Sequence, residues 1–182
     1  IMNGRLYFTL PLGHAGSGGG YICLDLRTGE QIWYRADLGV NNTAAPSKGQ
    51  LYEYESFNQH GVVGGMLWQV VGSTWNAYDP FTGQWMYTLT NVPSGFEVYT
   101  DNGEIVRYVL NSARKWLALW NNTAEHQGLQ GGTGDDTNAY QWRPNGKTVD
   151  MSKAYTWNVT IPDLPGNSAP TIVKVLPGDL IL

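Results

Sequence analysis

The sequence predicts an all-β fold, and three features of its composition lead to this prediction. Glycine counts 23 of the 182 residues, aromatic residues make up 13% of the chain, and charged residues make up only 14%. An average soluble domain has roughly 25% charged residues. Short strands joined by many glycine-containing turns fit this composition, and the chain shows no convincing amphipathic helical period.

A five-residue Asp-x-x-Thr-Gly pattern occurs twice, and its two copies lie 54 residues apart. In each copy the Asp carboxylate is expected to accept hydrogen bonds from backbone N–H groups inside a turn, and Thr adds a similar local bond. Gly tolerates the positive φ that the turn needs. Each copy lies between two apolar segments, so the pattern predicts two tight β-hairpins. The residues assigned to these structural turns are Asp25, Thr28, Gly29, Asp79, Thr82 and Gly83.

A third unit is altered. Residues 104–110 and 115–120 predict two strands, but Asn121-Asn122-Thr123 stands where the Asp-x-x-Thr-Gly turn is expected. A polar, Gly-rich stretch from Ala124 to Asp150 follows, and residues 154–161 predict the returning outer strand. We interpret the third unit as a hairpin opened by an insertion.

Repetition at this period is typical of repeat arrays and propellers. The fold class we predict is therefore all-β, with β-propeller blades that are four-stranded antiparallel sheets in an incomplete ring, because closed propellers have about four to eight blades. The whole chain, 1–182, is one propeller segment with blade-like units at about 1–45, 46–93 and 94–166, and a further blade starts at 167–182. We expect either a fragment of a larger propeller or pairing of copies through open blade edges.

The segments Tyr21 to Trp33 and Trp75 to Tyr87 resemble the repeat of PQQ-type, or quinoprotein, β-propellers. That repeat has an apolar strand, Asp, two variable residues, Thr-Gly and a Trp a few positions later. Lys115 to Trp120 matches only the strand. The resemblance implies the fold, whereas propellers of this kind serve as enzymes, assembly scaffolds and surface proteins. In the PQQ-dependent alcohol dehydrogenases a disulfide between adjacent cysteines caps the cofactor, and the single Cys23 cannot supply it.

The leading functional interpretation is a non-catalytic propeller segment of an exported surface or assembly protein that acts as an interaction scaffold. Its partner is another protein, the remainder of its own propeller, or a second copy bound through open blade edges. One alternative is part of a PQQ-dependent quinoprotein oxidoreductase whose cofactor residues lie elsewhere in a longer chain. A second is a carbohydrate-binding propeller. No catalytic residue and no cofactor are assigned, because the turn roles explain Asp25 and Asp79.

The insertion holds the candidate metal ligands. Asp135, Asp136 and Asn138 place carboxylate and amide oxygens close together on a Gly-rich backbone, and these are ligands that calcium prefers. The Asp-x-Asp-x-Asp-Gly register of a dedicated calcium loop is absent, so a solvent-exposed insertion explains the same residues.

The insertion also holds the candidate contact residues for a ligand or partner. Trp142 is flanked by Tyr140 and Arg143 in a polar segment, whereas most other Trp residues lie in predicted strands, where packing between blades explains them. Aromatic and Arg side chains are enriched at binding surfaces. We therefore expect a specific function of this chain to lie in the insertion.

Three Asn-x-Thr sequons, at Asn41, Asn121 and Asn158, favour an extracellular or cell-surface glycoprotein. The net charge of −4 and the scattered 11 Lys and Arg residues argue against nucleic-acid binding, which needs a clustered basic surface. The sequence has no run of about 20 apolar residues, so it predicts no membrane-spanning segment.

Overall fold

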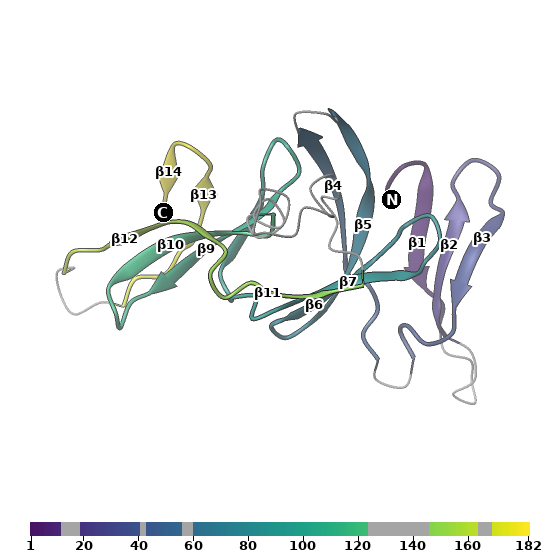
Figure 1. Cartoon of the computed structure of the whole chain (residues 1–182), viewed down its shortest axis with the longest axis horizontal. Helices are drawn as coiled ribbons and strands as arrows, with labels where there is room; N and C mark the ends of the chain where they lie inside the picture. The colour runs from purple at the N-terminus through teal and green to yellow at the C-terminus, as the bar shows by residue number, and fades with distance from the viewer. Residues whose placement is uncertain (12–18, 41–42, 56–59, 124–145, 164–168) are drawn as a thin grey trace. The chain divides into compact units, whose positions relative to one another are not determined.

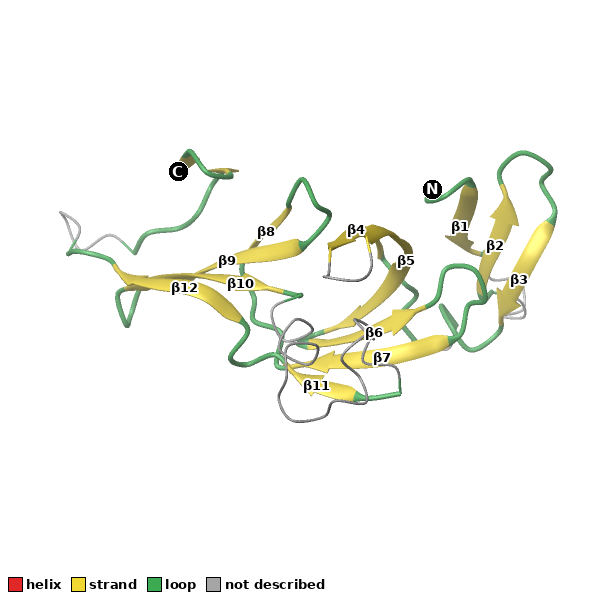
Figure 2. Cartoon of the chain, turned by 45° about the horizontal axis from the view of Figure 1, so that its top comes forward, coloured by secondary structure: helices red, strands yellow, loops and turns green. Residues whose placement is uncertain are grey.

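The computed structural model describes residues 1–11, 19–40, 43–55, 60–123, 146–163 and 169–182, and all regular structure in these ranges is β-strand (Figure 1, Figure 2). The strands of the first half are β1 Arg5–Thr9, β2 Tyr21–Asp25, β3 Gln31–Arg35, β4 Lys48–Glu55, β5 His60–Val71, β6 Thr74–Tyr78 and β7 Trp85–Thr90. The later strands are β8 Phe96–Tyr99, β9 Ile105–Asn111, β10 Trp116–Asn121, β11 Thr148–Asp150, β12 Tyr155–Thr160, β13 Val175–Leu176 and β14 Leu180–Ile181. Because these ranges contain no helix, they contain none that could cross a membrane.

Hydrogen bonds join the strands into four sheets. We call them the first sheet (β1-β2-β3), the second sheet (β11-β7-β6-β5-β4), the third sheet (β12-β10-β9-β8) and the C-terminal hairpin (β13-β14). The strand pairs whose register is resolved are all antiparallel, and most neighbours in a sheet are also consecutive in the sequence. The prediction of an all-β fold of antiparallel sheets is confirmed.

The sheets differ in size from the predicted four strands. The third sheet has four, while the first has three in the described residues and the second has five. The fifth strand, β11, belongs to the end of the stretch that the sequence marks as a polar insertion. The backbone approaches β7 there, since Gly146 N–H donates to Met86 O (2.7 Å) and Thr88 N–H donates to Lys147 O (3.0 Å). A three-residue strand carries too short a pattern to be recognised in sequence.

The described residues form two compact units, the first within residues 1–89 and 146–148 and the second within residues 90–123, 149–163 and 169–182. Each unit has its own apolar core. The core of the first unit contains Met2, Tyr21, Cys23, Trp33, Leu38, Leu67 and Tyr78. In the second unit, buried Val106, Tyr108 and Val175 pack with half-buried side chains of the third sheet and of the C-terminal segment.

Candidate functional site

The two Asp-x-x-Thr-Gly turns have the same hydrogen bonds. The Asp25 carboxylate oxygen Oδ1 accepts from the backbone N–H groups of Arg27 and Thr28, both at 2.9 Å, and Asp79 Oδ1 accepts from the second and third residues after it in the same way. Gly29 N–H donates to Asp25 O, and Gly29 has a φ of 74°. The second turn repeats both features at Gly83, whose φ is 69°.

The hydrogen bonds of the first turn change the pKa of the Asp25 carboxyl. The backbone N–H groups of Thr28 and Arg27 hold the pKa of Asp25 below its ordinary value, because they bind the charged form of the carboxylate. The Oδ1 atom of this carboxylate is therefore used by the turn.

The three larger sheets share one pairing register across three neighbouring strands. In the first sheet, Tyr7, Cys23 and Trp33 lie opposite one another across β1, β2 and β3, and the pairing shifts by one residue directly after Cys23. The pairing in the second sheet shifts in the same way directly after Ala77, and in the third sheet directly after Leu119. Such a β-bulge twists the strand locally and is a defined structural feature.

Each of these positions is the centre of a row of three residues, which we call the aromatic row. The rows are Tyr7–Cys23–Trp33, Trp68–Ala77–Tyr87 and Tyr108–Leu119–Trp157. In each row the two outer rings lie in contact over the central residue, with centroids 6.0, 5.6 and 6.1 Å apart in order. We call the face that carries the row the front face of its sheet. Trp157 thus occupies in the third sheet the place of Trp33 in the first.

The third hairpin closes at its base although its turn is replaced. Asn121 N–H donates to Ala154 O at 2.9 Å, just as Asp25 N–H donates to Glu30 O at 2.8 Å. The Asn121 side chain also begins the same turn, since its Oδ1 accepts from Thr123 N–H at 2.8 Å. The insertion therefore lies between Thr123 and Ala154, inside a hairpin whose strands keep their normal pairing.

Additional side-chain hydrogen bonds hold the base of the third hairpin. Glu104 Oε1 accepts from Thr123 Oγ1 at 2.7 Å and from Asn121 Nδ2 at 3.1 Å. The fully buried Asn122 accepts from Ile105 N–H at 2.9 Å through its Oδ1. These contacts fix the strand leading into the insertion.

The returning strand is fixed as well. Met151 is fully buried, its carbonyl accepts from the Trp120 indole N–H at 3.0 Å, and its own N–H donates to Thr90 O at 2.9 Å. Asp150 Oδ1 accepts from Asn91 Nδ2 at 3.0 Å, and this bond together with the Ser152 N–H lowers the pKa of Asp150. The described residues on both sides of the insertion are therefore held by hydrogen bonds and burial.

The front face of the first sheet is covered by the turn of the second hairpin. Tyr7 Oη and Trp33 Nε1 both donate to Pro80 O, at 3.1 and 3.0 Å. Arg35 donates to Gly83 O at 2.5 Å. Three side chains of one sheet therefore bind the backbone of the next sheet's turn, and Trp33 is only 9% exposed.

The ring of Trp33 also lies against Gly83. A Cβ atom at Gly83 would lie 2.8 Å from Trp33 Cδ2, closer than carbon atoms approach without a shift of the structure, whereas a Cβ at Gly29 would meet nothing within 4 Å. Two constraints thus require glycine at position 83, namely its positive φ and the close approach of the Trp33 ring. The Thr-Gly pattern in the sequence indicates only the positive φ.

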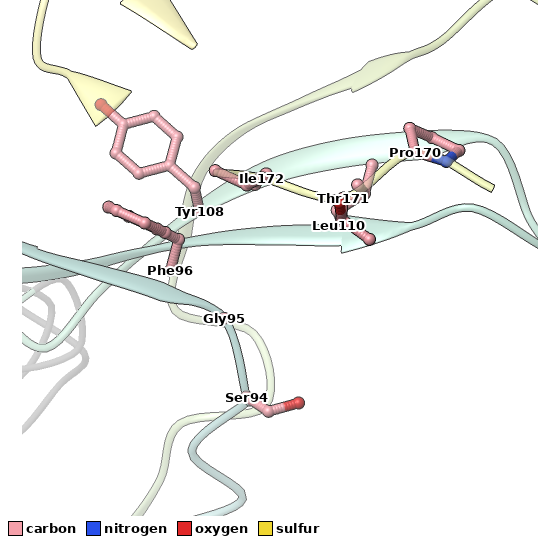
Figure 3. A pocket seen from close by; sticks show the side chains of 8 residues that line it. All are labelled: Ser94, Gly95, Phe96, Tyr108, Leu110, Pro170, Thr171 and Ile172. Atoms are coloured by element: carbon pink, nitrogen blue, oxygen red, sulfur yellow. The ribbon is translucent and has the colours of Figure 1, made fainter. Parts of the chain in front are cut away.

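The front face of the third sheet is covered in part. Ile172, Val175 and Ile181 of the C-terminal segment pack against this face. A groove of about 390 Å³ remains beside it, lined by Ser94, Gly95, Phe96, Tyr108, Leu110, Pro170, Thr171 and Ile172 (Figure 3). In Figure 3 the rings of Phe96 and Tyr108 stand side by side on neighbouring strands, with Ile172 next to them. The lining of the groove is mixed apolar and polar, and it contains no carboxyl, amine or imidazole side chain.

Cys23 lies at the centre of the first aromatic row and is fully buried. Burial raises the pKa of the Cys23 thiol, and it raises the pKa of Tyr21 to about 12. A thiol in such surroundings is unreactive. Cys23 is also the only cysteine of the chain. The chain therefore cannot form the disulfide between adjacent cysteines that caps the cofactor in PQQ-dependent alcohol dehydrogenases.

The predicted binding residues of the insertion, Asp135, Asp136, Asn138, Tyr140, Trp142 and Arg143, lie outside the described residues, as does the sequon at Asn41. Of the other two sequons, Asn158 is exposed on β12, whereas Asn121 is half-buried and bonded to Glu104. Within the described ranges no group of three or more His, Cys, Asp or Glu side chains is placed to hold a metal ion.

Sequence reasoning missed the groups that bind the second turn. Tyr7 and Arg35 stand in ordinary strand patterns, and the carbonyl oxygens of Pro80 and Gly83 leave no trace in a sequence. The equivalence of Trp157 with Trp33 had a usable signal, because each of them lies three residues after the residue that closes its hairpin, Ala154 and Glu30. No protein-family model and no curated protein matches the chain.

Proposed function

We propose that the chain is a segment of a β-propeller whose sheets are blades, and that it acts as a non-catalytic interaction scaffold of an exported surface or assembly protein. Three sheets that repeat one register, one bulge and one aromatic row support this proposal, since a repeat array stacks equivalent units. The resemblance of the two hairpins to quinoprotein repeats points the same way.

The observation that carries the proposal is the binding of the Pro80–Gly83 turn by Tyr7, Trp33 and Arg35. In a propeller every blade must present one face to the blade before it and the other to the blade after it. The front face of the first sheet meets the second sheet in this manner, within the first unit. The front face of the third sheet is met by the C-terminal segment, within the second unit.

A scaffold needs a structured frame and a binding element. The strands beside the insertion are anchored by buried residues, Asn122 before it and Met151 after it. Binding residues are often found on loops that a rigid scaffold positions. We therefore place the partner contact in the insertion, with Tyr140, Trp142 and Arg143 as its contact residues and Asp135, Asp136 and Asn138 as candidate calcium ligands.

The test of the non-catalytic role is a cofactor assay on the purified full-length protein, because the oxidoreductase alternative places the cofactor residues elsewhere in a longer chain. The protein is mixed with PQQ and calcium, freed of unbound cofactor, and supplied with a primary alcohol and an electron-accepting dye. We expect no retained PQQ absorbance and no reduction of the dye. Dye reduction that depends on both calcium and the alcohol would overturn the scaffold proposal in favour of an oxidoreductase.

The blade assignment has its own test in Trp33→Phe. This change keeps an aromatic ring but removes the indole N–H that donates to Pro80 O, so we expect the free energy of unfolding to fall by about 1 kcal/mol. The control is Tyr87→Phe, which removes a polar group from the second row, where the Tyr87 hydroxyl contacts Met66 of the same sheet. An unchanged stability of Trp33→Phe would contradict the turn-binding role.

A further inference from the structure

The first Asp-x-x-Thr-Gly turn has the geometry of the second but no cover among the described residues. Leu26, which stands in the place of Pro80, is 51% exposed. The space beside Gly29, where Trp33 lies at Gly83, is open to 4 Å. Within the part of the chain that the structure describes, this turn is therefore an uncovered copy of the turn that the first sheet binds.

The third sheet has the counterpart of that binding surface. Tyr108, Leu119 and Trp157 repeat the row that ends at Trp33, with almost the same distance between the two aromatic rings. The C-terminal segment covers the row at Tyr108, which is buried. Leu119 at the centre of the row and Trp157 at its other end also pack against this cluster, but both remain half-buried.

The outer end of this face is also apolar and open. Val159 lies opposite Leu117, as Arg35 lies opposite Tyr21 in the first sheet, and Val159 is 49% exposed. In the first sheet the corresponding end, at Trp33 and Arg35, is where Gly83 of the bound turn lies. Among the described residues, the part of the third sheet's front face that a turn occupies in the first sheet is only partly covered at Leu119 and Trp157, and it is exposed at Val159.

We propose that the front face of the third sheet, at Leu119, Trp157 and Val159, receives the Asp25–Gly29 turn of a second copy of this chain. The inference rests on the proposed function, because it takes the sheets to be equivalent blades. The occupant follows from the first unit, where the equivalent row binds the same kind of turn. In the third sheet Trp157 takes the place of the donor Trp33, whereas Val159 replaces the donor Arg35 and offers an apolar contact. Leu26 and Val159 are both exposed and apolar, so their burial favours association.

The association is head to tail, since each copy offers one turn and one face that differ from each other. Such heterologous contacts produce closed rings or open filaments, and blocking one surface leaves the other active. A symmetric interface would behave differently, because both copies would contribute the same surface. One substitution would then damage the contact on both sides.

The experiment uses two single variants of the full 182-residue chain. Leu26→Glu places a charge on the turn and leaves the face intact, and Val159→Glu does the reverse. We expect the unchanged chain to associate in analytical ultracentrifugation, and each variant alone to sediment at the mass of one chain, 20.1 kDa. An equimolar mixture of the two variants should form a heterodimer and nothing larger, because it retains one intact turn and one intact face.

The matched control is Val71→Glu, which adds the same charge at a residue that is 52% exposed beside a different turn. It should associate as the unchanged chain does. A monomeric unchanged chain at all concentrations, a mixture that stays monomeric, or an equal loss in Val71→Glu would each overturn the proposal.

Failure of this inference is distinguishable from failure of the proposed function. All three substituted side chains are exposed, so circular dichroism and urea unfolding should report folded variants whichever way the association turns out. The blade assignment depends instead on the effect of Trp33→Phe on stability. A stable monomer that loses stability on Trp33→Phe would retain the blade assignment and exclude the second copy as occupant.

Discussion

The second and third hairpins use the same strand pairing but close it by different means. In the second, the turn Asp79–Gly83 satisfies its own backbone, and Asp79 N–H donates to Gln84 O at 2.8 Å. In the third, Asn121 N–H still donates to Ala154 O, but the chain between them is an insertion. The bulge and the aromatic row are unchanged. The equivalence of the sheets therefore resides in strand register, and the turn is the part that can be replaced.

What replaces the turn is a set of longer-range hydrogen bonds. Glu104 and Asn122 hold the outgoing strand, and Met151 holds the returning one through Trp120. The short turn stabilises its hairpin by keeping the loop closed locally, at little entropic cost. A long insertion raises that cost, and buried polar contacts at the base offset it.

The largest expected difference in stability is between variants at Trp33 in the first aromatic row and at Trp157 in the third. Trp33→Ala should lower the free energy of unfolding by about 3 to 5 kcal/mol, because it removes a buried indole and its hydrogen bond. Trp157→Ala should cost clearly less, since Trp157 is half-buried. Urea titrations in dilute solution measure both changes. The exposed Trp85→Ala is the control, and equal losses at Trp33 and Trp157 would contradict the difference in cover.

The second effect compares the two turn glycines. Gly29→Ala should lower the free energy of unfolding by about 1 to 2 kcal/mol, the cost of an L-residue in the left-handed region. Gly83→Ala should cost a further amount of about 1 to 3 kcal/mol, because its methyl group would meet the Trp33 ring. Thermal and urea unfolding give the difference. Similar losses for the two variants would argue that Trp33 does not depend on this close approach.

A smaller effect concerns acid stability. The folded-state pKa of Asp25 lies below that of the unfolded chain, so its contribution to stability is present above about pH 4, the unfolded value, and is lost as the pH falls through the folded value. In Asp25→Asn this contribution should disappear, and the fall in stability towards acid should become shallower. Asn121 at the equivalent position of the third hairpin does not titrate. Asn121→Asp should instead lower the stability at neutral pH, because the new carboxylate would lie beside Glu104, to which the Asn121 amide donates, and protonation at acidic pH would relieve this repulsion. Stability measured from neutral to acidic pH tests both variants.

The smallest effect on stability, but a clear one in mass, concerns the two described sequons. When the chain is secreted from a eukaryotic cell, Asn158→Gln should remove a glycan, because Asn158 is exposed. Asn121→Gln should leave the glycan mass unchanged, because the Asn121 amide already donates to Glu104. Digestion with an endoglycosidase followed by mass spectrometry compares them. Loss of a glycan from Asn121→Gln would show that Asn121 is modified before the base of the third hairpin forms, and would contradict this prediction.

The sequence predicted the local parts of this structure well. The bonds at Asp25 and Asp79 reach only two or three residues along the chain, so the Asp-x-x-Thr-Gly pattern contains all the groups that form them. It also located the opened hairpin, because Asn121-Asn122-Thr123 breaks the repeat. The predicted boundary at Asp150 missed β11, since those three residues gain strand structure only by pairing with β7.

The candidate site was predictable only where it lies within one segment. Trp33 stood at a repeat position, but its acceptor, Pro80 O, is 47 residues away, and its partner Tyr7 reaches the same oxygen across 73 residues. Nothing in the sequence around Glu104 indicates its structural role, because this role depends on the side chains of Asn121 and Thr123, which the fold brings to it.

The sequence by itself therefore determined the all-β class, the two closed turns and the place where the third hairpin opens, since each depends on residues close along the chain. Only the tertiary structure decided that Trp157 takes the place of Trp33, that Pro80 and Gly83 present their carbonyls to the preceding sheet, and that the turn at Gly29 has no such cover among the described residues. The physical reason is that hydrogen bonds to backbone carbonyls and ring contacts between sheets depend on geometry, which residue identity alone does not specify.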